Sequence, residues 1–191
     1  MKLKLPDSDI TYFSNFMENK EATACFEKLK SSVPWRQDEI RVYGKIYPQP
    51  RLTALYGNND RSYTYSGIVM KPLPFSEILS DIRKRISSLT NVEFTSCLLN
   101  LYRDGRDSNG WHSDDEKELG NNPVIASVSL GQERYFHLRH KKLKDLKHKI
   151  LLEHGSLLLM SGQTQHYWQH QIPKTTRPIG ERINLTFRVI S

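Results

Sequence analysis

The feature that most constrains the fold is a set of metal-binding side chains that lie far apart in the sequence. His112 and Asp114 are separated by a single residue, so an extended segment points both to the same side. His170 is the third candidate ligand and has to arrive from another strand, which forces the chain to fold back on itself. Two imidazoles and one carboxylate can hold one face of an iron(II) ion, as in the facial triad of non-haem oxygenases. A histidine and an aspartate at this spacing are common, and the alternative is a surface histidine beside the acidic cluster Asp114, Asp115 and Glu116.

An alternating segment near the end of the sequence favours the metal-site interpretation. Its apolar face carries Ile183, Leu185, Phe187 and Val189, and its polar face carries Arg182, Asn184, Thr186 and Arg188. In an isolated strand the polar face would lie in water. Beside a metal, two guanidiniums would instead reach the two ends of a small dicarboxylate, which arginine binds through paired, charge-assisted hydrogen bonds. Asn100 and Tyr102 form another same-face pair, which either adds neutral donors or lies on a solvated strand face.

From about Val42 to Arg188 the chain resembles a known family, the AlkB-type dioxygenases, which use iron(II) and 2-oxoglutarate. The matching motifs in chain order are Val42 to Lys45, Pro50-Arg51, Tyr56-Gly57, Tyr63 to Gly67, Asn100 to Tyr102, Trp111 to Glu116, Ile125 to Gly131, Phe136 to His140, His154 to Leu157, Trp168 to His170 and Arg182 to Arg188. The resemblance is strongest to the members that repair alkylated DNA bases.

The resemblance implies a role for each matching position at the metal. His112, Asp114 and His170 would bind Fe(II), with 2-oxoglutarate and O2 as co-substrates. The residues implied for 2-oxoglutarate are Asn100, Tyr102, Arg182, Asn184, Thr186 and Arg188. Within this set, Arg182 would meet the distal carboxylate, and Arg188 would lie near the end that chelates the metal.

The resemblance also implies a set of residues that contact the substrate. A hairpin formed by Val42, Tyr43, Gly44 and Lys45 would probe the duplex and hold open the gap left by a flipped base. Tyr63, Thr64 and Tyr65 would line the base pocket, Asp115 and Glu116 would meet the polar edge of the base, and Arg51 and Arg139 complete the set. Tyr43 and Tyr65 stand where the family carries phenylalanine, a departure that leaves the fine substrate preference open.

The function implied is a DNA repair dioxygenase that oxidatively demethylates 1-methyladenine and 3-methylcytosine and releases formaldehyde, succinate and CO2. Both lesions are cationic and pair weakly, which lowers the cost of flipping them out of the duplex. Two alternatives remain open: an Fe(II)/2-oxoglutarate demethylase that acts on RNA or protein, and a catalytically silent nucleic-acid-binding jelly roll. A zinc hydrolase is disfavoured, because nothing near His112 supplies the general base that such a site needs.

The charge balance of the chain is consistent with a polyanionic partner. The net charge is +7, which favours a polyanionic partner. The resemblance implies that this partner is DNA that carries alkylated bases, or RNA. The protein is expected to be a monomer. A basic run suits either phosphate contacts or a solvated hairpin loop: Arg134, Arg139, His140, Lys141, Lys142, Lys144, Lys147, His148 and Lys149.

Cys25 and Cys97 lack the spacing of a disulfide framework or a zinc ribbon. No membrane segment is expected, and we expect a bacterial cytoplasmic protein, with the nucleus as an open alternative.

The pattern of short strands predicts a mainly β protein with flanking helices. Strand-like runs begin near Ser96, Val124, Arg134, Lys149, Ser156, Gln165 and Arg182, which is the rhythm of a jelly roll or double-stranded β-helix. Helices are expected at about 19–30, before Pro34, and at about 75–88. A single domain of 191 residues would then hold helices and a nucleotide-recognition lid over about 1–91 and the β-helix over about 92–191. Tyr12, Tyr47 and Tyr56 are expected in the core.

Overall fold

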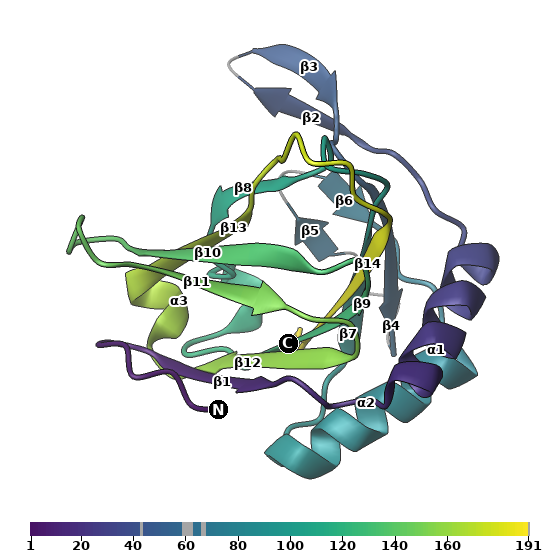
Figure 1. Cartoon of the computed structure of the whole chain (residues 1–191), viewed down its shortest axis with the longest axis horizontal. Helices are drawn as coiled ribbons and strands as arrows, with labels where there is room; N and C mark the ends of the chain where they lie inside the picture. The colour runs from purple at the N-terminus through teal and green to yellow at the C-terminus, as the bar shows by residue number, and fades with distance from the viewer. Residues whose placement is uncertain (43, 59–62, 66–67, 191) are drawn as a thin grey trace.

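Most of the strands lie in two antiparallel sheets that face each other. The computed structural model describes residues 1–42, 44–58, 63–65 and 68–190. Within them the large sheet has the order β1 (Asp9–Phe13), β12 (Ser156–Ser161), β9 (Ile125–Gly131), β14 (Arg182–Arg188), β7 (Ser96–Tyr102) and β4 (Leu52–Gly57). The small sheet has the order β11 (Lys147–Leu152), β10 (Arg134–His140), β13 (Trp168–Ile172) and β8 (Asn109–His112). The predicted mainly β architecture with flanking helices is confirmed (Figure 1).

Two helices cover the outer face of the large sheet (Figure 1). Helix α1 is Asn19–Ser32 and helix α2 is Glu77–Thr90, so each ends two residues later than expected. Helix α1 continues to Ser32 because only Val33, the residue before Pro34, must leave the helical conformation. Helix α2 begins at the side-chain cap of Ser76 and ends at Asn91, which takes the left-handed conformation at φ 55°.

Each face of the large sheet buries its own apolar layer. The layer under the helices joins Leu29 of α1 and Ile82 of α2 to the odd-numbered face of β14, which carries Ile183, Leu185 and Phe187. The layer between the sheets contains Leu138, Leu152, Met160, Trp168 and Ile172. Tyr12 and Tyr56 are buried as expected, but the prediction for Tyr47 is wrong, because its side chain is 47% exposed on β3 (Lys45–Pro48).

Two further departures from the expected strand pattern concern the sheets. The run expected near Gln165 is a short helix, α3 (Thr164–Tyr167), and the strand begins only at Trp168. Both edge strands of the large sheet, β1 and β4, come from the part of the chain expected to hold only helices and the lid. They complete the sheet by pairing with β12 and β7, respectively.

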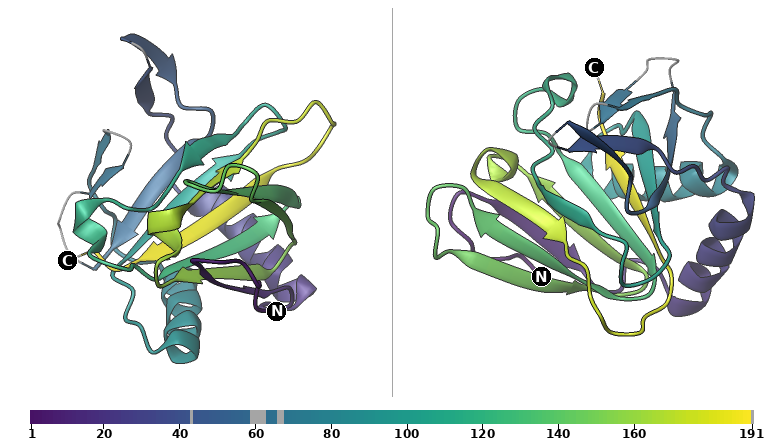
Figure 2. Two further views of the ribbon diagram at one scale, coloured as in Figure 1. Left: turned by 90° about the vertical axis from the view of Figure 1, so that its left-hand side faces the viewer. Right: turned by 90° about the horizontal axis from the view of Figure 1, so that it is seen from above.

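Two small hairpins lie outside the facing sheets, and one of them projects from the rest of the molecule (Figures 1 and 2). That hairpin joins β2 (Glu39–Val42) to β3, pairs Val42 with Lys45 and turns at Gly44, while Tyr43 lies outside the described residues. The other joins β5 (Tyr63–Tyr65) to β6 (Ile68–Met70). The side chains expected to line the base pocket, those of Tyr63, Thr64 and Tyr65, lie outside what the structure describes. In the described part of the chain, no helix has the length and apolar character needed to cross a bilayer.

Candidate metal and co-substrate site

The small sheet brings the three predicted metal ligands together. Strand β8 ends at His112, which lies opposite His170 of β13, and the two ring centroids are 4.2 Å apart. Asp114 follows two residues after the end of β8. One ligand atom from each of His112, Asp114 and His170 can be chosen so that all lie within 4.8 Å of one another. A single ion can therefore contact all three side chains, and two imidazoles with one carboxylate are the donor set that suits non-haem iron(II).

The position of Asp114 is set by contacts to three other elements. Its backbone N–H donates to Gln165 Oε1 of α3 at 2.9 Å. Its Oδ1 accepts from Arg188 Nη2 of β14 at 2.6 Å. The preceding Ser113 donates from Oγ to the carbonyl of Trp168 at 2.9 Å. These contacts fix both the loop and the carboxylate before any metal is bound.

The electrostatics keep the three ligands in the protonation states that a metal requires. Burial lowers the pKa of His170 from 6.5 to about 3, and burial lowers the pKa of His112 as well. Burial alone would raise the pKa of Asp114, but the positive charge of Arg188 and the neighbouring imidazoles outweigh it and lower this pKa to about 2. Neutral imidazoles and an ionised carboxylate are the forms that coordinate a metal.

The structure also buries a guanidinium that is incompletely paired. Arg182 is 1% exposed, and its Nη2 donates to Ser129 Oγ at 2.9 Å. Its Nε and Nη1 have no hydrogen-bond partner among the described residues. Burial lowers the pKa of Arg182 to about 10, which leaves it charged at neutral pH. A buried cation without a counter-ion is costly, so this arrangement fits an anionic ligand such as a carboxylate.

The guanidinium and the triad open into the same pocket between the two sheets. Its lining includes Asn100, Tyr102, Arg182, Asn184, Thr186 and Arg188 from the large sheet and His112, Asp114 and His170 from the small sheet and its loop. The polar face of β14 is therefore enclosed rather than solvated. The pair Asn100 and Tyr102 on β7 is enclosed as well. Within this set, Asn184 uses its amide for internal bonds, to Ser127 Oγ and the Val128 carbonyl, so it lines the pocket mainly as a support.

The residues expected to contact the substrate are distributed differently. Asp115 is exposed and pairs with Lys141 at 3.1 Å, whereas Glu116 is half-buried and burial raises its pKa. Arg139 donates from Nε and Nη2 to Gln169 Oε1, and its guanidinium lies 4.3 Å from the centre of the Trp111 ring.

Arg51, which was expected to contact the substrate, is buried. Its Nε donates to Asn100 Oδ1 at 2.7 Å, and Asn100 is a residue of the pocket lining.

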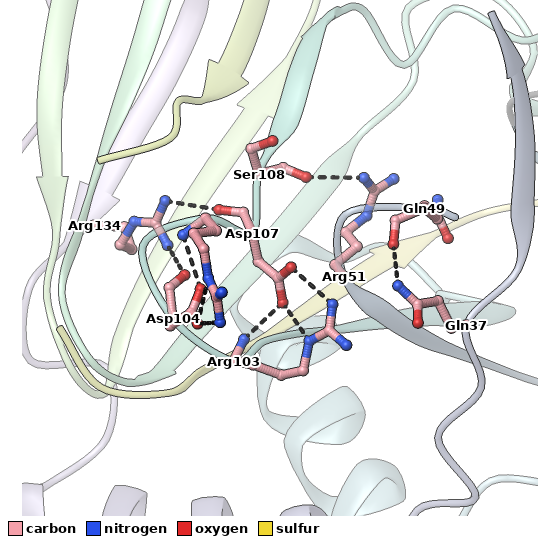
Figure 3. A network of polar contacts seen from close by, with 9 residues as sticks. Gln37, Gln49, Arg51, Arg103, Asp104, Asp107, Ser108 and Arg134 are labelled. Atoms are coloured by element: carbon pink, nitrogen blue, oxygen red, sulfur yellow. Dashed lines mark hydrogen bonds and ion pairs between the residues drawn. The ribbon is translucent and has the colours of Figure 1, made fainter. Parts of the chain in front are cut away.

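The basic run is not one surface. Arg134 is buried and donates to the carbonyls of Asp104 and Asp107 (Figure 3) and to that of Pro173. His140 is buried too, and its Nε2 lies 3.2 Å from Asp7 Oδ2. Neither of the two alternatives left open for the basic run, phosphate contacts or a solvated loop, holds for these two buried side chains. The lysines of the β10–β11 turn, Lys141, Lys142 and Lys144, remain exposed, as does Lys147 at the start of β11.

The sequence did not predict a role for three residues that support the site. Gln165 holds the backbone of Asp114, Ser129 accepts from Arg182, and Phe136 stacks on the ring of His170 with centroids 5.0 Å apart. The alternation of β9 and β10 puts Ser129 and Phe136 on inward faces, but their partners depend on strand register, which a single sequence does not provide. Nothing in the sequence pattern around Gln165 indicates its contact with Asp114.

Comparison with known proteins identifies the family of this site. The family model described as the 2OG-Fe(II) oxygenase superfamily matches residues 9–188. The chain belongs to this superfamily. Its members use Fe(II) with 2-oxoglutarate and O2, and the His112, Asp114 and His170 triad together with the unpartnered Arg182 atoms fits these groups.

Relatives confirm the resemblance to the AlkB-type dioxygenases. The chain is 43% identical to the alpha-ketoglutarate-dependent dioxygenase alkB homolog 3 of Mus musculus, over 96% of this chain and 66% of that protein. It is 37% identical to the DNA oxidative demethylase ALKBH2 of Mus musculus, over 89% of this chain and 75% of that protein. The chain thus spans just under two thirds of the length of the alkB homolog 3 relative.

Solved structures share the fold at low sequence identity. The structure of OsALKBH1 matches with a TM-score of 0.63 and 19% identity, covering 94% of this chain and 97% of that one. A prolyl hydroxylase from Trichoplax adhaerens, solved in complex with a hypoxia inducible factor peptide fragment, matches with a TM-score of 0.64 and 14% identity. The match covers 95% of this chain and 83% of that one. At these identities the likeness extends to the fold alone, and it confirms the jelly-roll class.

Proposed function

We propose that this chain removes N-methyl groups from nucleic-acid bases, with 1-methyladenine and 3-methylcytosine in DNA as its substrates. The observation that carries the proposal is the enclosure, in one pocket, of the triad His112, Asp114 and His170 and of the incompletely paired Arg182. The name of the ALKBH2 relative, a DNA oxidative demethylase, supports DNA as the substrate.

Different residues of the pocket would bind the metal and the co-substrate. His112, Asp114 and His170 would hold Fe(II), which together with 2-oxoglutarate and O2 supplies the oxidation of an N-methyl group to a hydroxymethyl group that leaves as formaldehyde. Arg188 holds the carboxylate of Asp114 and adds positive charge at the metal end of the pocket. Arg182, deeper along the same strand face, would bind the distal carboxylate of 2-oxoglutarate through its free Nε and Nη1.

The acidic residues beside the metal support a cationic base as the substrate. Asp115 and Glu116 follow Asp114 directly, inside a protein whose net charge is +7. Glu116 is half-buried, and its Oε2 has no partner among the described residues. A methylated adenine or cytosine carries the positive charge that this edge would attract, whereas the repaired neutral base would be held less strongly.

The test is turnover of a defined oligonucleotide that carries one 1-methyladenine. The reaction is run with and without 2-oxoglutarate, and its product is measured by mass spectrometry. We expect loss of the methyl group and stoichiometric formaldehyde in the wild-type protein and neither in Asp114→Ala. Asp81→Asn, on the exposed side of α2, is the matched control and should retain turnover. Turnover restricted to methylated RNA or peptide would overturn the substrate assignment. Wild-type turnover by Asp114→Ala would overturn the metal site.

A further inference from the structure

Arg51 is buried beside Asn100, a residue of the pocket lining. It directly precedes β4 and follows the β2–β3 hairpin. Its Nη1 donates to the carbonyl of Ser108 at 3.1 Å (Figure 3). The Ser108 N–H donates to the carbonyl of Pro50 at 2.9 Å. The carbonyl of Pro50 and the guanidinium of Arg51 are therefore both held by Ser108, which directly precedes the strand β8 that carries His112.

The guanidinium determines which way the Asn100 amide faces. Arg51 Nε lies 2.7 Å from Asn100 Oδ1. A guanidinium has donors only, so the amide must turn its oxygen to Arg51 and its nitrogen the other way. No described residue accepts a hydrogen bond from Asn100 Nδ2, and Asn100 lines the pocket that holds Arg182 and the triad. The amide therefore presents two N–H donors, rather than a carbonyl oxygen, to whatever anion enters.

We propose that Arg51 is a positioning residue for the co-substrate: it locks the Asn100 amide so that Nδ2 donates to a carboxylate of 2-oxoglutarate. The inference rests on the proposed function and changes the role of Arg51 from a nucleic-acid contact to a support of the co-substrate site. Without Arg51, the amide is free to turn its oxygen toward the pocket, where an oxygen repels a carboxylate that a nitrogen would attract.

Three variants test this inference. Arg51→Met keeps most of the apolar stem but removes the donors, Arg51→Lys keeps a cationic donor, and Asn100→Asp keeps an acceptor for Arg51 while it replaces the pocket-facing N–H groups with an oxygen. The binding of 2-oxoglutarate is measured anaerobically by calorimetry with Mn(II) in place of iron. Mn(II) affinity and the affinity for an unmodified oligonucleotide are measured in parallel.

We expect Arg51→Met to weaken 2-oxoglutarate binding about tenfold or more, with Mn(II) and oligonucleotide affinity within about twofold of wild type. Arg51→Lys should recover part of the loss. Asn100→Asp should weaken 2-oxoglutarate binding at least as much while its melting temperature stays at or above that of wild type, because it strengthens the contact to Arg51. A purely structural role would not separate stability from affinity in this way.

The outcomes distinguish the two proposals. If the wild-type protein with Mn(II) does not bind 2-oxoglutarate, the proposed function fails. If the wild type binds it and Arg51→Met binds equally well, or loses only oligonucleotide affinity, the positioning role is overturned. If Arg51→Met does not fold, Asn100→Asp decides, and unchanged 2-oxoglutarate affinity in that variant contradicts the inference.

Discussion

His170 is buried as a neutral imidazole, and this protonation state links the stability of the protein to pH. The unfolded chain takes up a proton at His170 below about pH 6.5, whereas the folded protein resists doing so until about pH 3. The unfolded state therefore binds more protons in this interval, and lowering the pH stabilises it relative to the folded state. The same sign applies to His112, whose pKa is also lowered by burial.

We accordingly expect the metal-free protein to lose melting temperature as the pH falls from about 7 to about 5. His170→Asn removes one contributing group, so its melting temperature should fall less steeply over the same interval. Thermal melts of both proteins, in chelator at matched ionic strength, give the comparison. Equal slopes would show that His170 is not held neutral by its surroundings.

Arg182 illustrates a residue whose burial serves a ligand at the expense of stability. Replacement by methionine removes an incompletely paired buried charge, so Arg182→Met should melt at or above the temperature of the wild type. It should also weaken 2-oxoglutarate binding on the order of 100-fold, since a charge-assisted pair is lost. Calorimetry with Mn(II) and differential scanning fluorimetry measure the two effects. A strong loss of stability would mean that the guanidinium is satisfied internally.

Sequence alone was informative for residues whose chemistry shows in their spacing. The alternating face of β14 could be selected because position within one strand determines where a side chain points, and His112 and Asp114 could be selected by their close spacing, although Asp114 lies just beyond the end of β8. The partner relations of Arg51, Gln165 and Ser129 could not, because each is a contact between segments far apart in the chain.

At the level of elements, the end of β9 is built around a conformation that only glycine adopts easily. Gly131 has φ +84° and lies opposite Arg182 in the sheet. A Cβ atom there would lie 2.5 Å from the carbonyl of Glu181, a backbone contact that cannot move freely.

Gly131→Ala should therefore destabilise the protein by about 2 kcal/mol or more. Because Glu181 directly precedes Arg182, the substitution should also weaken 2-oxoglutarate binding. Gly110→Ala is the matched control, since nothing lies within 4 Å of its Cβ position, and it should change the free energy of unfolding by less than about 1 kcal/mol. Chemical denaturation of both variants checks this, and equal stabilities would remove the steric argument.

Strands with a clear two-residue period were predictable, whereas the edges of the large sheet were not. β14 alternates without a break, and α2 shows helical spacing of its apolar residues. β1 and β4 are short, and each is assigned to the large sheet only by pairing with a strand far away in the chain. The stretch at Gln165 looks extended in sequence, but Thr164–Tyr167 makes one helical turn before β13.

For the whole molecule, the net charge of +7 and the exposed lysines of the β10–β11 turn predict salt-dependent binding of nucleic acid. If about four phosphates are neutralised, affinity for single-stranded DNA should fall roughly sevenfold when the salt concentration doubles. The double variant Lys142→Gln, Lys144→Gln should show a shallower dependence. Fluorescence anisotropy at several salt concentrations measures both slopes, and identical slopes would remove this turn from the binding surface.

The order of strands in the large sheet also affects how the chain reaches its native state. One of its two central strands, β14, is the last described strand along the chain. Its first strand, β1, pairs with β12 more than a hundred residues later, as in the register of Asp9 with Ser161. During synthesis on the ribosome, β1 and β4 emerge before β12 and β7, the strands with which they pair. Such non-local pairing slows folding and leaves unpaired edges exposed in the meantime, so nascent chains of this protein should depend on chaperones until β14 has emerged.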